Sequence, residues 1–258
     1  MNIFRWLHRQ SLVASGLLLG ACLIALAPGT SSAQPAEMKE LRYCGDAEGG
    51  APFVEADPQE PERVRGFDVE IAELLARELH LRPRFVQVAF ASLDASAQRG
   101  DCDIALCGVE DTPARRQRQL VSVPYFAFRE VLTVRAADAE RLRDLTDLRG
   151  RKVGTLGGTL AWELLRGAEH EHGVVPVTYE DDVHPYTDLQ EGRIDGVVLD
   201  HIIARRAAAR AADLRIQPAQ LQGGHYVIVV GAGRAALRDR IDELLRAAMR
   251  DGTLRRIY

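Results

Sequence analysis

The feature that most constrains the fold of this chain is a regular alternation between segments with strand patterns and segments with helix patterns. Such segments follow one another over residues 41–44, 67–79, 84–88, 92–99 and 103–107. The first helical segment places Phe67, Ile71 and Leu75 on one apolar face. Strands that are separated by helices pair in parallel through right-handed crossovers. The alternation therefore predicts an α/β fold, with a mostly parallel sheet flanked by helices.

The same pattern begins again further along the chain. Its strand-like and helix-like segments lie at 131–135, 145–148, 152–155, 159–167, 174–179 and 194–199. A last strand over 225–230 and a long helix over 235–250 complete it. Because 258 residues leave room for one large domain or two small ones, the restart predicts two α/β units.

Composition argues against several other classes of protein. A hydrophobic content of 47% supports a packed core, and a net charge of −4 disfavours nucleic-acid binding. The Gly231-Ala232-Gly233 segment lacks the following acidic strand that a dinucleotide site needs. His170 and His172 alternate at the end of a helix and so face different ways, which disfavours a metal site. We expect no cofactor and no metal.

The N-terminus has the pattern of an export signal, which predicts a periplasmic location. Arg5 and Arg9 precede an apolar stretch over 12–27, and Ser31-Ser32-Ala33 supplies the small residues of a cleavage site. We therefore assign residues 1–33 to a signal peptide. Lipid anchoring at Cys22 stays open as an alternative, and no later segment has the length and apolarity of a membrane span.

Three cysteines follow the predicted signal. Cys102 and Cys107 lie on one predicted strand, five residues apart, so they should face opposite sides and not bond to each other. Cys44 and Cys107 fall on neighbouring predicted strands, where an oxidising compartment permits a disulfide. The alternative is that all three are small buried apolar residues.

Two short stretches offer opposite charges to a ligand. Thr112-Pro113-Ala114-Arg115, with Pro124-Tyr125 behind it, supplies a fixed cation, and in the stretch over 192–200 the apolar strand Val197-Val198-Leu199 ends on Asp200. Open α/β sheets bind ligands at this carboxyl edge of their strands. An α-amino acid needs one cation for its carboxylate and one anion for its ammonium group. We therefore expect Arg115 and Asp200 to face each other across one cavity.

These stretches and their spacing resemble the bacterial family 3 solute-binding proteins, the periplasmic amino-acid receptors of ABC importers. The resemblance extends from about Leu41 to the last residue. It implies the two-lobe periplasmic binding protein fold (type II), with lobe 1 at 38–130 and 228–258 and lobe 2 at 131–227. It also implies a hinge of two crossings, near residues 131–134 and 226–229.

The resemblance implies a role for each motif residue. Arg115 binds the ligand's α-carboxylate, helped by Thr159 at the start of a helix and by the backbone N–H of Leu160. Asp200 binds the α-ammonium group. From the residues alone, Arg115 as a surface arginine and Thr159 and Asp200 as plain helix N-caps stay open.

Four further residues are weaker site candidates. Phe90 is expected to pack on the ligand, and Gly108 and Asp46 follow strands that lead to the cleft. Glu110 stands where the family usually has a Ser or Thr. Asp46 and Glu110 together suggest an acidic pocket and hence a cationic ligand such as arginine or lysine.

The predicted function is a monomeric extracytoplasmic receptor that captures an amino acid and delivers it to an ABC permease. It requires no catalysis and no nucleic acid. The alternative on the same fold is an enzyme similar to the periplasmic cyclohexadienyl dehydratases, in which Glu110 or Asp200 acts as general acid. A stand-alone receptor and one part of a split transporter both stay open.

Overall fold

The computed structural model describes residues 39–258. The predicted signal peptide at 1–33 and the alternative anchor at Cys22 lie outside the described residues. Among the described residues, no helix is both long enough and apolar enough to span a bilayer.

The first sheet joins strands from both ends of the described chain. Its order is β4 (Arg82–Gln87), β1 (Glu40–Gly45), β5 (Ile104–Ala105), β12 (Val229–Val230) and β6 (Leu120–Val121). The first three strands are parallel, as predicted, because α1 (Phe67–Glu78) and α2 (Leu93–Arg99) connect them. β12 pairs antiparallel with both β5 and β6, so the sheet is mixed.

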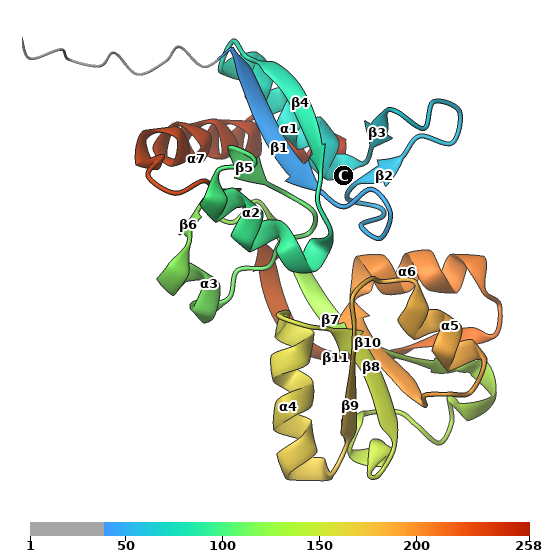
Figure 1. Ribbon diagram of the computed structural model, residues 1–258. Coiled ribbons are helices and arrows are strands. Elements are labelled where there is room, and N and C mark those ends of the chain that lie inside the picture. The colour runs from blue at the N-terminus through green and yellow to red at the C-terminus, as the bar shows by residue number, and fades with distance from the viewer. Residues whose placement is uncertain (1–38) are drawn as a thin grey trace, which may run out of the picture. The chain divides into compact units, whose positions relative to one another are not determined.

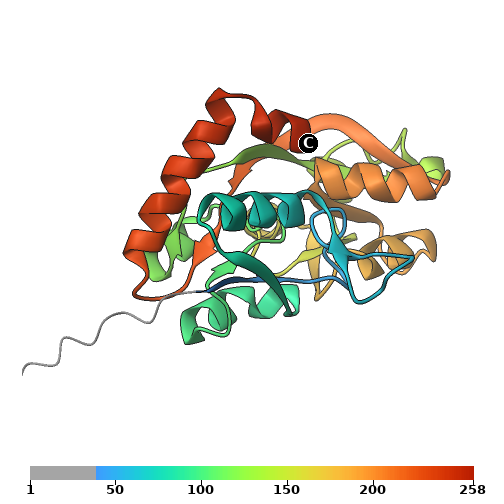
Figure 2. The ribbon, with the colours of Figure 1, turned by 90° about the horizontal axis from the view of Figure 1, so that it is seen from above.

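The C-terminal helices complete this half of the molecule. α7 (Ala235–Arg250) has the predicted bounds, and it is followed by α8 (Thr253–Ile257). Both contact α1, near the other end of the described chain, and they are drawn in red in Figure 2. The remaining elements here are β2 (Glu55–Ala56), β3 (Val64–Arg65), η1 (Phe90–Ser92) and α3 (Pro113–Arg118).

The second sheet is formed by the middle of the chain. Its order is β11 (Leu214–Tyr226), β7 (Phe126–Arg135), β10 (Gly196–Asp200), β8 (Lys152–Leu156) and β9 (Val175–Tyr179). Figure 1 shows α4 (Leu160–His172) on one side of this sheet, and α5 (His184–Gln190) and α6 (His201–Arg210) on the other. The short η2 (Ala136–Asp138) and η3 (Leu145–Leu148) follow β7.

The long strand β11 was not predicted. The sequence indicates one strand over 225–230, whereas the structure ends β11 at Tyr226 and starts β12, in the other sheet, at Val229. β11 is an edge strand with register shifts against β7, so it tolerates Pro218 and the Gly223-Gly224 pair. These residues interrupt the alternation of apolar and polar residues by which a strand is predicted from sequence.

Two short connections join the sheets. The chain leaves β6 and enters β7 over residues 122–125, and it leaves β11 and enters β12 over 227–228. The first connection thus precedes the predicted crossing at 131–134, because Phe126 already pairs with Tyr226 in the second sheet. The lobe boundaries at 130/131 and 227/228 stay a prediction.

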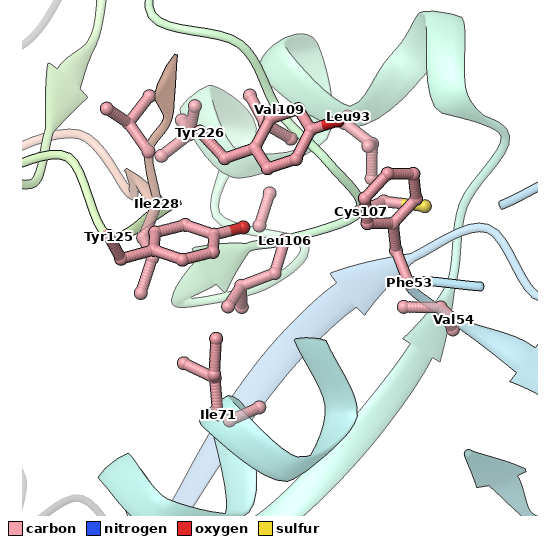
Figure 3. Packing of buried hydrophobic residues seen from close by; sticks show 14 of the residues in the cluster. Phe53, Val54, Ile71, Leu93, Leu106, Cys107, Val109, Tyr125, Tyr226 and Ile228 are labelled. Carbon is pink, nitrogen blue, oxygen red and sulfur yellow. The ribbon is translucent and has the colours of Figure 1, made fainter. Parts of the chain in front are cut away.

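Aromatic side chains pack where these connections meet. Tyr226 is fully buried, and its ring lies 5.2 Å from that of Phe53 and 4.5 Å from that of Phe128. Figure 3 shows Tyr226 near Tyr125, with Phe53 and Cys107 beside them. One continuous apolar core therefore includes residues from both sheets.

The disulfide of the described chain joins Cys44 to Cys102, and Cys107 is buried and free. The Cys44–Cys107 pair that the sequence allowed does not form. The parallel register sets Cys44 opposite Ala105, and Cys107 lies beyond this pair. Its thiol contacts the carbonyl oxygens of Asp46 and Gly50 at 3.9 Å each.

This disulfide should stabilise the fold, because it closes a loop between residues 58 positions apart. A Cys44→Ala/Cys102→Ala variant should lose about 2–4 kcal/mol of unfolding free energy in urea denaturation without reductant. Reductant should lower the wild-type midpoint and leave the variant unchanged. An equal free energy of unfolding for the variant and the wild type, both without reductant, would contradict a stabilising Cys44–Cys102 disulfide.

Candidate ligand-binding site

A small enclosed cavity lies where the carboxyl edges of the two sheets meet. Its volume is about 20 Å³, and its lining includes the carboxyl groups of Glu110, Asp182 and Asp200. Glu110 comes from the loop after β5, Asp182 from the loop after β9, and Asp200 from the end of β10. Among the described residues that line it, no lysine, arginine or histidine occurs.

Glu110 connects the two halves of the cavity wall. Its Oε2 accepts a hydrogen bond of 2.5 Å from the backbone N–H of Leu160, the first residue of α4. Burial raises the pKa of Glu110 to about 8; the Leu160 N–H offsets part of this, and the charge of Asp200 adds to it. The carboxyl group is therefore mostly protonated at neutral pH when no cation is near.

Asp200 and Thr159 each cap a helix, as the plain N-cap interpretation predicted. Asp200 Oδ1 accepts the N–H groups of Ile202 and Ile203 at 2.8 and 3.0 Å. Thr159 Oγ1 accepts the Trp162 N–H at 3.2 Å and donates to the Leu156 carbonyl. Both residues also line the cavity, so capping leaves a ligand role open. Burial raises the pKa of Asp200 to about 6.

Asp182 is a site residue that the sequence reasoning missed. It is 7% exposed, and burial, together with the charge of Asp181, raises its pKa to about 7. It follows β9 at the same sheet edge that led us to Asp200, so the same rule would have found it.

Glu130 adds a fourth buried carboxyl group, which was also missed because it lies within an apolar strand. It lies on β7 directly opposite Asp200 of β10 and is fully buried. Among the described residues, neither of its oxygens has a hydrogen-bond partner. Burial and the charges of Glu110 and Asp200 raise its pKa well above the usual range; the Ala161 N–H offsets this slightly but does not lie in hydrogen-bonding geometry.

Arg115 does not face Asp200 across this cavity. It lines a neighbouring pocket of about 530 Å³, together with Phe90 and Gly158. Its Nε donates to both carboxylate oxygens of Asp94 at 3.0 Å, and its Nη1 donates to the carbonyl of Glu110. The expectation of two opposite charges in one cavity is therefore not met, because Glu110 stands between them.

The local sequence explains where Arg115 lies. Thr112 caps α3 by accepting the Arg115 N–H at 3.2 Å, and Pro113 occupies the first helical turn. This turn directs the guanidinium back toward the loop that carries Glu110. Its side chain is 10% exposed, so Arg115 is not a surface arginine.

Two of the other candidates line the cavity, and the third holds a neighbouring loop in place. Phe90 and Gly108 line the cavity, and Gly108 has φ +63°, with no space for a Cβ beside the Phe53 ring. Asp46 is not part of the lining. Its carboxylate accepts N–H groups of Glu48, Gly49, Phe90 and Gln87, so it shapes the loop and does not offer a free charge to the ligand.

A second network, not predicted from the sequence, holds the Gly108 loop in place. Asp68 of α1 is fully buried, and its carboxylate accepts the Gly108 N–H at 2.7 Å and the Tyr125 hydroxyl at 2.8 Å. Burial raises the pKa of Asp68 to about 7. This network ties the loop that carries Glu110 to the first connection between the sheets.

The model of the bacterial extracellular solute-binding proteins, family 3, matches residues 44–258. The chain belongs to this family. The ABC transporter arginine-binding protein 1 of Escherichia coli is 27% identical over 199 residues, or 75% of this chain and 80% of its own length. A probable histidine-binding protein of Neisseria gonorrhoeae is 27% identical over 266 residues, or 100% of this chain and 95% of its own.

Solved structures give the same result. An ancestral arginine-binding protein bound to arginine superposes with a TM-score of 0.78 and 26% identity, over 85% of this chain and 96% of its own. The predicted two-lobe periplasmic binding protein fold is confirmed. The roles of the individual cavity residues stay predictions.

The buried carboxyl groups predict a free energy of unfolding that falls as the pH rises. The ordinary pKa values are 3.8 for Asp and 4.5 for Glu, against about 6, 7 and 8 for folded Asp200, Asp182 and Glu110. Between these values the folded state keeps protons that the unfolded chain releases. The stabilisation is complete below about pH 4 and is lost as the pH rises through about 6 to 8.

Thermal melts of the ligand-free protein should therefore show a Tm that decreases from about pH 5 to about pH 8.5. A Glu110→Gln/Asp200→Asn variant should show a flatter profile over the same range, because two of the titrating groups are removed. A wild-type Tm that rises with pH would contradict the raised pKa values.

Proposed function

We propose that this protein is an extracytoplasmic receptor that binds an amino acid with a cationic side chain between its lobes and delivers it to an ABC permease. The observation that carries the proposal is the acidic lining of the cavity, with three buried carboxyl groups and no basic side chain among the described residues. A buried carboxylate is unfavourable until a cation pairs with it. A cationic solute supplies that partner.

Binding requires the lobes to separate and close again. A cavity of about 20 Å³ holds about one water molecule, so an amino acid enters an open form. Contacts between the halves favour the closed form. They include the Glu110–Leu160 hydrogen bond and an ion pair between Arg206 of α6 and Glu55 of β2. Closure of this kind is what a permease would recognise.

The ligand's two ends would bind different walls. Its ammonium group and cationic side chain bind Asp200, Asp182 and Glu110. Its carboxylate binds the first turn of α4, at Thr159 and Leu160, and Arg115. For this, Glu110 turns away from the Leu160 N–H and Arg115 releases the Glu110 carbonyl.

The acidic lining of the cavity disfavours the dehydratase alternative. Glu110 is protonated at neutral pH, as a general acid must be, which keeps the dehydratase alternative testable. However, arogenate and prephenate each carry two carboxylates, which this acidic cavity would repel. Incubation with either compound should give no product above the uncatalysed rate, and turnover would make the protein an enzyme.

The setting proposed for this receptor is the periplasm, where it acts as a monomer. The family is extracellular by description, and the relatives named above include a protein described as part of an ABC transporter. A separate permease and a split transporter both fit this setting.

The proposal predicts which solutes stabilise the protein. In a thermal-shift screen of the twenty amino acids, arginine, lysine or histidine should raise the Tm, and aspartate and glutamate should not. A ligand at 100 times its Kd adds about 2.7 kcal/mol to the free energy of unfolding. The proposal fails if no cationic amino acid changes the Tm at millimolar concentration.

Asp200→Asn should weaken binding of the best cationic amino acid by about 100-fold or more, because the ligand's cation loses a buried partner. Asparagine is also a good N-cap, so α6 should remain folded. Calorimetry measures the Kd, and Asp213→Asn, at an exposed position of the same lobe, serves as the matched control. A loss below about fivefold would remove Asp200 from the site.

A further inference from the structure

The groups that could bind a ligand's carboxylate are already bound by the protein. The Leu160 N–H, at the start of α4, donates to the Glu110 carboxyl group at 2.5 Å. The Arg115 guanidinium donates to Asp94 at 3.0 Å and to the Glu110 carbonyl. The Glu110 carboxyl group thus occupies the position to which an amino acid would bring its own carboxylate.

The described lining of the cavity offers an incoming carboxylate no basic side chain. Glu110, Asp182 and Asp200 are each no more than 7% exposed. Their described neighbours in the lining are apolar residues, glycines, Cys107 and Thr159. A carboxylate placed among these groups meets the charge of Asp200 and no basic side chain in the described lining, which is unfavourable in a buried setting.

Glu130 is a further buried acidic residue beside this site. It lies opposite Asp200 across the β7–β10 pair and is fully buried, with no hydrogen-bond partner for either oxygen among the described residues. It interacts electrostatically with both Glu110 and Asp200. A buried group without a partner is unfavourable, and a nearby ligand cation would relieve it.

We infer that the cavity also takes organic cations that carry no carboxylate, namely diamines and guanidino amines, and binds them more tightly than the amino acids with the same side chain. This inference rests on the proposed function, since it assigns a second ligand class to the same site. The reason is that the two ligand classes break different hydrogen bonds of the protein. An amino acid displaces Glu110 from Leu160 and separates Arg115 from the Glu110 carbonyl, whereas an amine leaves both contacts in place.

The test uses ligand pairs that differ by the carboxylate alone. Arginine is compared with agmatine, lysine with cadaverine, and ornithine with putrescine, by calorimetry on the wild-type protein. In each pair the amine should bind about tenfold more tightly or better, which corresponds to the cost of one buried hydrogen bond. The experiment needs no variant, so no folding defect can obscure it.

Two variants at one position then test the role of Glu110. Glu110→Ser frees the Leu160 N–H and should reverse the preference, so that arginine binds more tightly than agmatine. Glu110→Gln keeps an oxygen that can accept from Leu160, so the preference for the amine should persist while both affinities fall. A Tm and a circular dichroism spectrum check the fold of each variant.

The outcomes separate the two claims. If arginine and lysine bind the wild type more tightly than agmatine and cadaverine, the inference is wrong and the proposed function stands. If the pairs favour the amines but Glu110→Ser leaves the preference unchanged, Glu110 is not the group that occupies the carboxylate position, and the inference is overturned in its mechanism. If no cation of either series binds, the proposed function itself fails.

Discussion

The burial of acidic side chains around a cavity whose described lining includes no basic side chain is the constraint on which this site depends. Glu110, Asp182, Asp200 and Glu130 lie together where the two sheets meet, and the charge of Asp200 raises the free energy of the charged forms of the other three. Backbone N–H groups offset part of this cost, those of Ile202 and Ile203 for Asp200 among them. A solute cation can offset the part of this cost that the backbone N–H groups leave.

Two helix N-termini give the cavity its polarity. α6 begins at the end of β10 and directs its free N–H groups at Asp200, while α4 begins after β8 and directs them at Glu110 and Thr159. Asp200 and Thr159 come from one half of the molecule, and Glu110 from the other. The same hydrogen bond that satisfies Glu110 therefore also joins the halves, so solute recognition and closure share a contact.

The helices and central strands were predictable because their patterns are local. α1 and α7 carry apolar residues at helical spacing, and α7 has the predicted bounds. The edge strand β11 was not, because edge strands tolerate proline and glycine. The strand predicted over 103–107 is present as β5, which pairs over two residues. Within the site, Asp200 was predicted because open α/β sheets bind ligands at the carboxyl ends of their strands. Asp182 also follows a strand at this edge but was not predicted. Glu130 was missed because it lies within a mostly apolar strand.

The sequence by itself determined the family, the two α/β units and the helix caps at Thr159 and Asp200. These depend on spacing, on capping chemistry and on residue type, which are properties of short segments. The tertiary structure alone decided that Cys44 bonds to Cys102, that Asp94 binds Arg115, and that Glu110 reaches Leu160. These pairings join residues far apart in the chain, and strand register and side-chain burial, which no local pattern records, bring them together.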